Sequence, residues 1–230
     1  MSGKNFNSLE GHRILITGGS RGLGLGIVEA LVERKTQVTV LARNRDRLDD
    51  VARRLGVAVM AGDVTDPELA FTALRDVRPN IVILNAGAVP PMGPIHQMSW
   101  GDFNCVWDQD VKAGLFWLQA AIRLPLPSGS RVLVGSSGAA IAGSPLSGGY
   151  AGAKRMLWLM WDYANGVSAK LDLGIRFQAL VPNQIIGSTG VGDVAAVAYA
   201  DSKGIRPAQQ RNQDTRAPVL GLRAGEPAEY

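Results

Sequence analysis

Short runs of apolar residues alternate with helix-length stretches along most of this chain. The apolar runs cover residues 13–17, 38–41, 57–60, 81–84, 131–134 and 175–180. The helix-length stretches between and after them cover residues 23–34, 45–55, 67–77, 100–122 and 150–171. Strands that are apolar throughout are typical of a parallel sheet whose two faces are covered by crossover helices. We therefore predict a single α/β domain built on a doubly wound parallel sheet.

Composition narrows the class of protein. The chain has 230 residues, enough for one well-filled core, and a formal net charge of +4. Its basic residues are scattered, and the dense run from Arg43 to Arg54 also holds three aspartates, so we predict a solvated helix face there and no nucleic-acid surface. The lone Cys105 excludes an internal disulfide, and two separate histidines, His12 and His96, do not predict a metal site.

Targeting signals are not visible. The first residues are polar, and no run of about 18 apolar residues occurs anywhere, so we expect no signal peptide, no membrane span and a cytoplasmic location.

The turn after the first apolar run is rich in glycine. Glycines let the backbone approach a pyrophosphate, and the following helix presents free N–H groups at its N-terminus. The residues predicted to contact a dinucleotide there are Gly18, Ser20, Arg21, Gly22, Leu23 and Gly24. The second strand ends at Arg43 without an acidic residue, where a carboxylate would favour NAD. Arg21 and Arg43 therefore predict NADP(H) over NAD, the alternative being that both are solvated surface arginines.

Polar and small residues follow the later strands. Tyr150 and Lys154, four residues apart, are predicted to lie on one helix face. A free tyrosine titrates near pH 10, and a nearby cation favours its phenolate, so such a pair suits proton transfer to a carbonyl. Ser137 follows the fifth strand, and Asn85-Ala86-Gly87 follows the fourth, at the edge where parallel sheets bind ligands. Taken singly, a Tyr-x-x-x-Lys spacing and a turn serine also arise by chance.

Together these segments resemble the short-chain dehydrogenase/reductase family. Residues 17–24 are similar to its Thr-Gly-x-x-x-Gly-x-Gly loop, Asp63 and Val64 to its adenine-pocket pair, and residues 85–87 to its Asn-Ala-Gly element. Ser137 lies 13 residues before Tyr150, which is the spacing of the family's catalytic serine and tyrosine. The resemblance covers residue 10 to about residue 200 and implies a Rossmann-type fold.

The resemblance also implies a reaction and its residues. Hydride would pass between NADP(H) and a small-molecule carbonyl or alcohol, without a metal. Tyr150 would be the general acid/base, Ser137 would orient the carbonyl, and Lys154 would favour the phenolate and hold the nicotinamide ribose. Asn85, Ala86, Gly87, Pro182 and Thr189 would line the cofactor, although Thr189 also fits an ordinary loop position. A homodimer or homotetramer is implied as well.

Three departures from the family pattern stand out. Pro182 after the sixth strand is followed by Asn183, where the family usually has Pro-Gly. Asp110 occupies the position of an active-site asparagine, so we predict reduced or pH-shifted activity and a higher turnover after Asp110→Asn. The chain past Gly204 is polar and shows no final strand, so we predict a domain over residues 1–204 and an atypical tail over 205–230, ordered or disordered.

These departures leave two functions open. The main prediction is an NADP-dependent carbonyl reductase or alcohol dehydrogenase. The alternative is a catalytically weak or inactive nucleotide-binding protein on the same fold. Residues 89–92 and 144–146 are predicted to form apolar substrate walls, unless their prolines serve only the loops.

Overall fold

A parallel sheet forms the centre of the molecule. The computed structural model describes residues 9–182, 187 and 189–202. In this part of the chain the sheet has six strands in the order β3-β2-β1-β4-β5-β6, and all neighbours are parallel. The strands are β1 (Arg13–Thr17), β2 (Gln37–Ala42), β3 (Ala58–Ala61), β4 (Ile81–Leu84), β5 (Arg131–Gly135) and β6 (Arg176–Leu180). The predicted doubly wound parallel sheet is confirmed.

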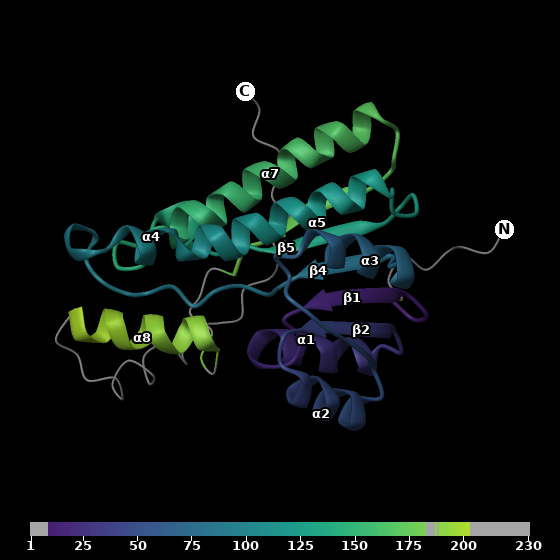
Figure 1. The fold of residues 1–230 in the computed structure, drawn as a ribbon, viewed down its shortest axis with the longest axis horizontal. Coiled ribbons are helices and arrows are strands. Elements are labelled where there is room, and N and C mark those ends of the chain that lie inside the picture. Colours follow the sequence, from purple (N-terminus) through teal and green to yellow (C-terminus); the bar gives the residue numbers. More distant parts are fainter. Residues whose placement is uncertain (1–8, 183–186, 188, 203–230) are drawn as a thin grey trace.

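Helices cover both faces of this sheet (Figure 1). One face carries α1 (Gly22–Glu33) and α2 (Arg45–Leu55), and the other carries α3 (Pro67–Val77), α5 (Lys112–Arg123) and α7 (Tyr150–Lys170). Trp117 and Trp161 are the largest fully buried side chains, and their indole N–H groups donate to the carbonyls of Val64 and Val132, both at 3.0 Å. The two tryptophans thus fill the core without leaving a buried donor unpaired. None of the described helices is long and apolar enough to cross a membrane.

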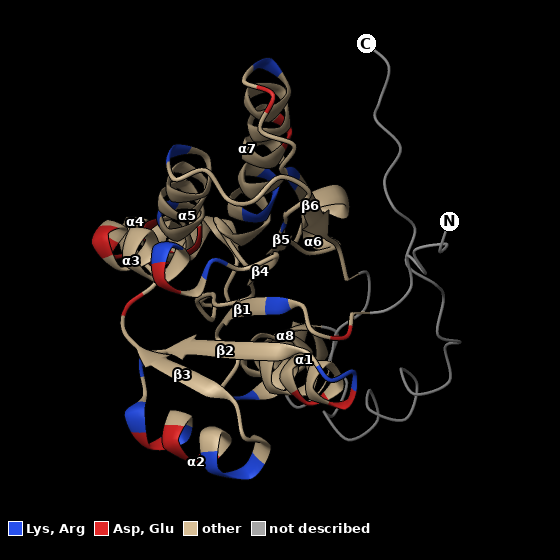
Figure 2. Ribbon diagram, turned by 90° about the vertical axis from the view of Figure 1, so that its right-hand side faces the viewer, with Lys and Arg blue, Asp and Glu red and all other residues tan. Residues whose placement is uncertain are grey.

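Local sequence explains the helix boundaries. The side chain of Asn44 accepts from the N–H of Arg47 and caps α2, which ends at Gly56 in the left-handed region. Asp66 caps α3, with Pro67 in the first turn. The charged run of α2 faces solvent, where Arg54 pairs with Glu29 at 3.0 Å (Figure 2). This confirms that the run is a solvated helix face.

The long helix predicted over residues 100–122 is wrong in one respect. The structure divides it into α4 (Trp100–Val106), a π-helical turn η2 (Trp107–Val111) and α5. The extra residue in a π turn changes which side chains point inward. Here it accompanies Asp110, which is buried and accepts a hydrogen bond from the N–H of Ala88 at 2.7 Å. A long-range contact therefore accompanies this interruption, which helical periodicity alone does not predict.

Helix α8 (Gly190–Ser202) was not predicted. Its signals were present, because Thr189 caps its first turn by accepting from the N–H of Gly192 at 3.0 Å and alanines fill its middle. Two shorter elements, η1 (Ile95–Gln97) and α6 (Ala139–Ala142), lie in segments for which no helix is predicted. The predicted tail over 205–230 lies outside the described residues, so its order and the expected final strand stay predictions.

The strand order of the sheet reverses direction between β1 and β4. These strands are neighbours, and the helices that follow them, α1 and the α4–α5 segment, go to opposite sides of the sheet. Ligands of open α/β sheets bind at such switch points, outside the carboxyl ends of the strands. Helices α4 and α8 both lie beyond that edge in Figure 1.

Candidate active site

The carboxyl ends of β1, β2 and β4 are tied together by hydrogen bonds. The N–H of Ala86 donates to Thr17 Oγ1 at 3.1 Å, and Asn85 Nδ2 donates to the carbonyl of Gly18 at 3.2 Å. Gly18 has a φ of +69°, and a Cβ there would lie 2.8 Å from Ala86 Cα. Glycine is therefore required at this position on two grounds, conformation and space. The sequence-predicted Gly-rich loop and the Asn85-Ala86-Gly87 segment are neighbours in the fold.

The N-terminus of α1 is suited to an anion. No side chain caps its first turn, and no acidic residue lies in that turn. Gly22 has a φ of +52°, and Arg21, the N-cap residue, is exposed. Free backbone N–H groups and the positive end of the helix dipole together favour a phosphate. Ser20, Leu23 and Gly24 belong to the same turn, so these residues fit the pyrophosphate of a dinucleotide.

Asp63 and Arg43 lie at the ends of the neighbouring strands β3 and β2. Asp63 Oδ1 accepts from the N–H and the hydroxyl of Thr65, both at 2.9 Å. The hydrogen bond from the Thr65 N–H is the main reason that the pKa of Asp63 is lowered; the charges of Arg43 and Lys112 act in the same direction, while partial burial opposes them. Val64 is buried beside it. This corner of the site therefore holds a charged carboxylate and an exposed arginine.

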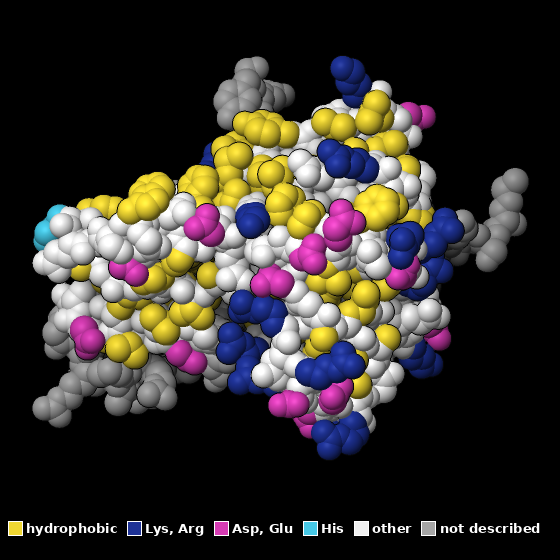
Figure 3. Space-filling view, in the orientation of Figure 1, with side chains coloured by type: hydrophobic (Ala, Val, Ile, Leu, Met, Phe, Trp, Pro, Cys, Tyr) yellow, Lys and Arg dark blue, Asp and Glu magenta, His cyan; other side chains and the backbone are white. Residues whose placement is uncertain are grey.

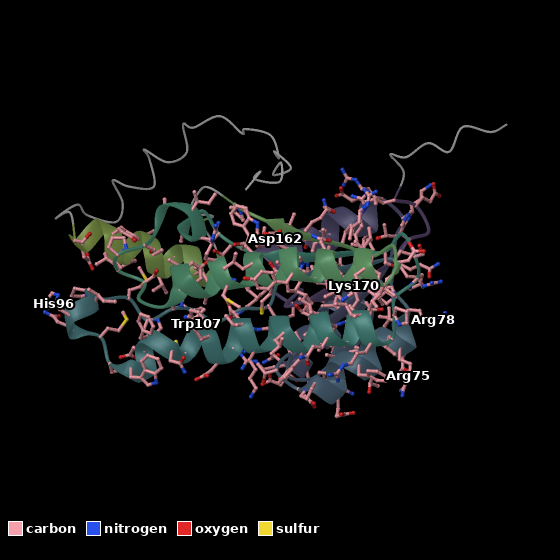
Figure 4. The ribbon with its side chains drawn as sticks, turned by 90° about the horizontal axis from the view of Figure 1, so that it is seen from above. Arg75, Arg78, His96, Trp107, Asp162 and Lys170 are labelled. Carbon is pink, nitrogen blue, oxygen red and sulfur yellow. The ribbon has the colours of Figure 1, made fainter. Side chains whose placement is uncertain are left out.

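Tyr150 is the first residue of α7, and its side chain is only 9% exposed. It belongs to a buried hydrophobic cluster with Val106 of α4, and Val191 of α8 packs against this cluster. The preceding Gly149 is in tight contact with α4, because a Cβ there would overlap the carbonyl oxygen of Phe103. Trp107 Nε1 donates to the carbonyl of Gly149 at 3.0 Å, where η2 meets the beginning of α7 (Figure 4). These contacts fix the position of the phenol.

Lys154 lies one helical turn after Tyr150 and is paired with Asp110. Lys154 Nζ is 3.0 Å from Asp110 Oδ2 and donates to the carbonyl of Gly135 at 3.0 Å. The two side chains are 10% and 1% exposed, respectively. Burial alone would lower the pKa of Lys154, but the negative charges of Asp110 and Tyr150 and the hydrogen bond to Asp110 outweigh it, so the pKa is raised. The ammonium is 5.6 Å from the centre of the Tyr150 ring.

Two glycines allow this ion pair to form. A Cβ on Gly114 would overlap Leu157 Cδ2, so the glycine lets α5 and α7 approach each other about one turn from the pair. A Cβ on Gly87 would lie 2.9 Å from Asp110 Oδ2. Sequence reasoning missed Gly114. Its signal was a glycine in a helix interior, four residues after Asp110, where glycine costs stability unless packing requires it.

Ser137 lies just past the end of β5 and is partly buried. Its hydroxyl oxygen accepts from the N–H of Ala139 at 3.2 Å. The neighbouring N–H of Gly138 donates to the carbonyl of Pro182 at 2.7 Å, which joins the ends of β5 and β6. Thr189 lies farther along, as the cap of α8. The structure therefore places Ser137 and Pro182 side by side.

The loops predicted as substrate walls contact each other. The N–H of Gly93 donates to the carbonyl of Leu146 at 2.7 Å. Ser144 Oγ and the Tyr199 hydroxyl are 2.8 Å apart, which connects this region to α8. His96 lies at the tip of the neighbouring segment (Figure 4). Among the described residues, no group of three or more His, Cys, Asp or Glu is arranged to hold a metal ion.

Comparison with known proteins identifies the family. Residues 12–185 match the model of the short chain dehydrogenase family. The chain belongs to this family. The resemblance deduced from the sequence motifs is thus confirmed, and the chain is a member of an oxidoreductase family.

Several relatives of known name support the assignment. A tropinone reductase homolog of Datura stramonium is 30% identical over 96% of this chain and 83% of the relative. An NADPH-dependent pterin aldehyde reductase of Arabidopsis thaliana is 28% identical over 80% of this chain and 79% of the relative. Gluconate 5-dehydrogenase of Gluconobacter oxydans is 29% identical, but its match covers only 58% of this chain and 56% of that protein.

A solved structure shares the fold of this chain. Sorbitol-6-phosphate 2-dehydrogenase of Erwinia amylovora superposes with a TM-score of 0.75 over 87% of this chain and 82% of that one. The two sequences are 20% identical. This likeness concerns the fold.

Proposed function

We propose that this protein is an NADP-dependent oxidoreductase that transfers a hydride between the nicotinamide and a carbonyl or alcohol substrate. One observation carries the proposal. A buried tyrosine, Tyr150, and a buried lysine one turn later lie at the carboxyl edge of the sheet. The uncapped N-terminus of α1 opens at the same edge.

The cofactor would lie across the switch point of the sheet. The turn from Gly18 to Gly24 would hold the pyrophosphate through backbone N–H groups. Asp63 and Val64 would line the adenine. The backbone of Asn85, Ala86 and Gly87 would lie beside a ribose. Pro182 and Thr189 would border the nicotinamide end. When bound, the nicotinamide supplies or accepts the hydride.

The preference for NADP(H) rests on Arg21 and Arg43. Both are exposed at the ends of β1 and β2, and β2 has no carboxylate at its tip. An arginine there accommodates a 2′-phosphate, whereas a carboxylate favours the free ribose hydroxyls of NAD. The Arabidopsis relative is named as NADPH-dependent, which supports the same preference.

Side chains of this protein would carry out the proton transfer. Ser137 would donate a hydrogen bond to the substrate oxygen and hold the carbonyl. In reduction, the hydroxyl of Tyr150 would give its proton to that oxygen, and Lys154 would stabilise the resulting phenolate. In oxidation, the phenolate would accept the proton of the alcohol. The apolar loops over residues 89–92 and 144–146 would favour hydrophobic carbonyl compounds.

NADPH consumption with a panel of aldehydes and ketones tests this function. Tyr150→Phe should reduce turnover by about 10²–10⁴-fold, because the proton donor is lost, while NADPH still quenches tryptophan fluorescence. Tyr163→Phe, an exposed tyrosine on the same helix, should leave turnover unchanged. Equal activity of the Tyr150→Phe variant and the wild type would contradict the assignment.

The pairing of Lys154 with Asp110 favours the alternative function, a nucleotide-binding protein with weak or no activity. In that case NADPH would quench the fluorescence without turnover of any carbonyl compound.

We also propose that the chain forms a homodimer or homotetramer. Hydrophobic side chains gather along the face of the molecule that carries α4, α5 and α7 (Figure 3). Exposed hydrophobic residues of α5, of α7 and of the end of α7 include Leu115, Tyr163, Val167 and Leu171. Contiguous apolar surface of this kind marks association sites.

A further inference from the structure

The carboxylate of Asp110 is held in place by two separate contacts. Oδ1 accepts the N–H of Ala88 at 2.7 Å, and Oδ2 lies 3.0 Å from Lys154 Nζ. The cavity beside the pair measures only about 10 Å³, at the lower limit for one water molecule. Solvent therefore screens the two charges poorly, and their interaction is strong.

Few other titratable groups surround Tyr150 and Lys154. The elements packed there carry these titratable side chains: Asp102 and Cys105 on α4, Asp108 and Asp110 on η2, Lys112 at the start of α5, and Asp193, Tyr199 and Asp201 on α8. Asp108 is exposed and accepts a hydrogen bond from Asn104 at 2.7 Å. The Tyr199 hydroxyl forms a hydrogen bond with the Ser144 hydroxyl. Asp110 is the carboxylate that contacts the ammonium directly.

An ammonium whose charge is neutralised by a carboxylate stabilises a neighbouring phenolate less than an unpaired ammonium does. An asparagine at position 110 can accept the Ala88 N–H in the same way but carries no charge, so the aspartate changes the charge of the site and not its shape. A protonated tyrosine is the form that reduces a carbonyl, and a phenolate is the form that oxidises an alcohol.

We propose that Asp110 is a positioning residue that biases this site toward carbonyl reduction by neutralising Lys154. The inference rests on the proposed function. The proton balance is complete: hydride bonds to the carbonyl carbon, the Tyr150 proton bonds to the oxygen, and the phenolate regains a proton from water. The reverse reaction starts from the phenolate, which the aspartate disfavours.

The effect is measurable as a shift along the pH axis. A charge within about 4–6 Å moves a titration by about 1–3 pH units when it is poorly screened, and Lys154 Nζ is 5.6 Å from the Tyr150 ring centre. Asp110→Asn leaves this ammonium uncompensated and should therefore move the half-point of alcohol oxidation to lower pH, by about one unit. At a pH below both half-points, a shift of about one unit raises oxidation about tenfold, whereas reduction, which uses the protonated phenol, stays nearly constant.

The experiment has an arm that does not need turnover. The ultraviolet absorbance of tyrosinate is followed as pH rises in the wild type, in Asp110→Asn and in Asp110→Ser, and the same titration of Tyr150→Phe identifies the component that belongs to Tyr150. Two uncharged replacements are used so that a folding defect in one does not decide the result. In both, the Tyr150 component should appear at lower pH than in the wild type.

Asp108→Asn is the matched control, because it removes a solvent-facing carboxylate from the same turn. It should move neither the tyrosinate titration nor the pH profile. Unmoved titrations in both Asp110 variants, or an equal shift in the control, would overturn the inference. If no carbonyl compound is turned over, the proposed function fails, whereas the tyrosinate titration still decides the charge effect.

Discussion

Lys154→Met removes the ammonium that lies 3.0 Å from a carboxylate of which only 1% is exposed. Methionine keeps most of the aliphatic volume of lysine, so the change is mainly electrostatic. Removing one partner of a buried pair costs about 3–5 kcal/mol, because the remaining charge stays desolvated without compensation. We therefore expect the free energy of unfolding to fall by about 4 kcal/mol, a large part of the total for a domain of this kind.

Urea unfolding followed by tryptophan fluorescence measures this loss, since Trp117 and Trp161 are buried. In an Asp110→Asn background the carboxylate is already absent, so Lys154→Met should cost only about 1 kcal/mol, for the hydrogen bond to Gly135. Lys170→Met, at the exposed end of the same helix, should change stability by less than about 0.5 kcal/mol. Equal costs of Lys154→Met in the two backgrounds would refute the ion-pair reasoning.

Four further predictions follow from the site and the surface. Arg43→Ala should raise KM for NADPH about tenfold and leave KM for NADH unchanged, since a charged contact worth about 1.4 kcal/mol is lost; equal changes for both cofactors would contradict the role of this arginine. Gly149→Ala should lower the free energy of unfolding by about 1–3 kcal/mol because its Cβ meets a backbone carbonyl. Gly166→Ala, where a Cβ meets open space, should raise the free energy of unfolding by up to about 1 kcal/mol. If urea unfolding showed the Gly149 variant to be the more stable of the two, this packing would be contradicted. Because the pKa of Lys154 is raised, its stabilising contribution is complete below its ordinary value of 10.5 and is lost as pH rises through the folded value; the urea midpoint should fall more steeply above pH 10.5 than in a variant lacking both members of the ion pair. Val167→Glu should shift the protein toward a smaller species in sedimentation velocity, and an unchanged sedimentation coefficient would place the subunit contact elsewhere.

Much of the fold could be predicted because its signals are local. Six apolar runs correspond to β1 through β6 within one or two residues, and the caps of α2 and α3 are readable as Asn44 and Asp66. Helix α8 was missed although Thr189 and its alanines signalled it. The sequence departs from the family pattern after Pro182, so the family resemblance does not indicate a helix there.

The interruption of the helix at η2, unlike helix α8, has no local sequence signal. Residues 100–122 have helical periodicity throughout, and no residue in that segment requires a π turn by itself. The turn coincides with the hydrogen bond from the Ala88 N–H to Asp110, two groups far apart in the sequence. Contacts of this kind depend on how the chain is folded back, which a periodic pattern does not contain.

The sequence by itself determined the doubly wound sheet, the Gly-rich turn before α1 and the spacing of Ser137, Tyr150 and Lys154. These features follow from residue type and position along one segment, where side-chain size and backbone freedom act locally. Only the tertiary structure decided that Asp110 is buried 3.0 Å from the Lys154 ammonium, because that contact joins η2 to α7. Close packing between segments creates the buried environment in which these two charges interact strongly.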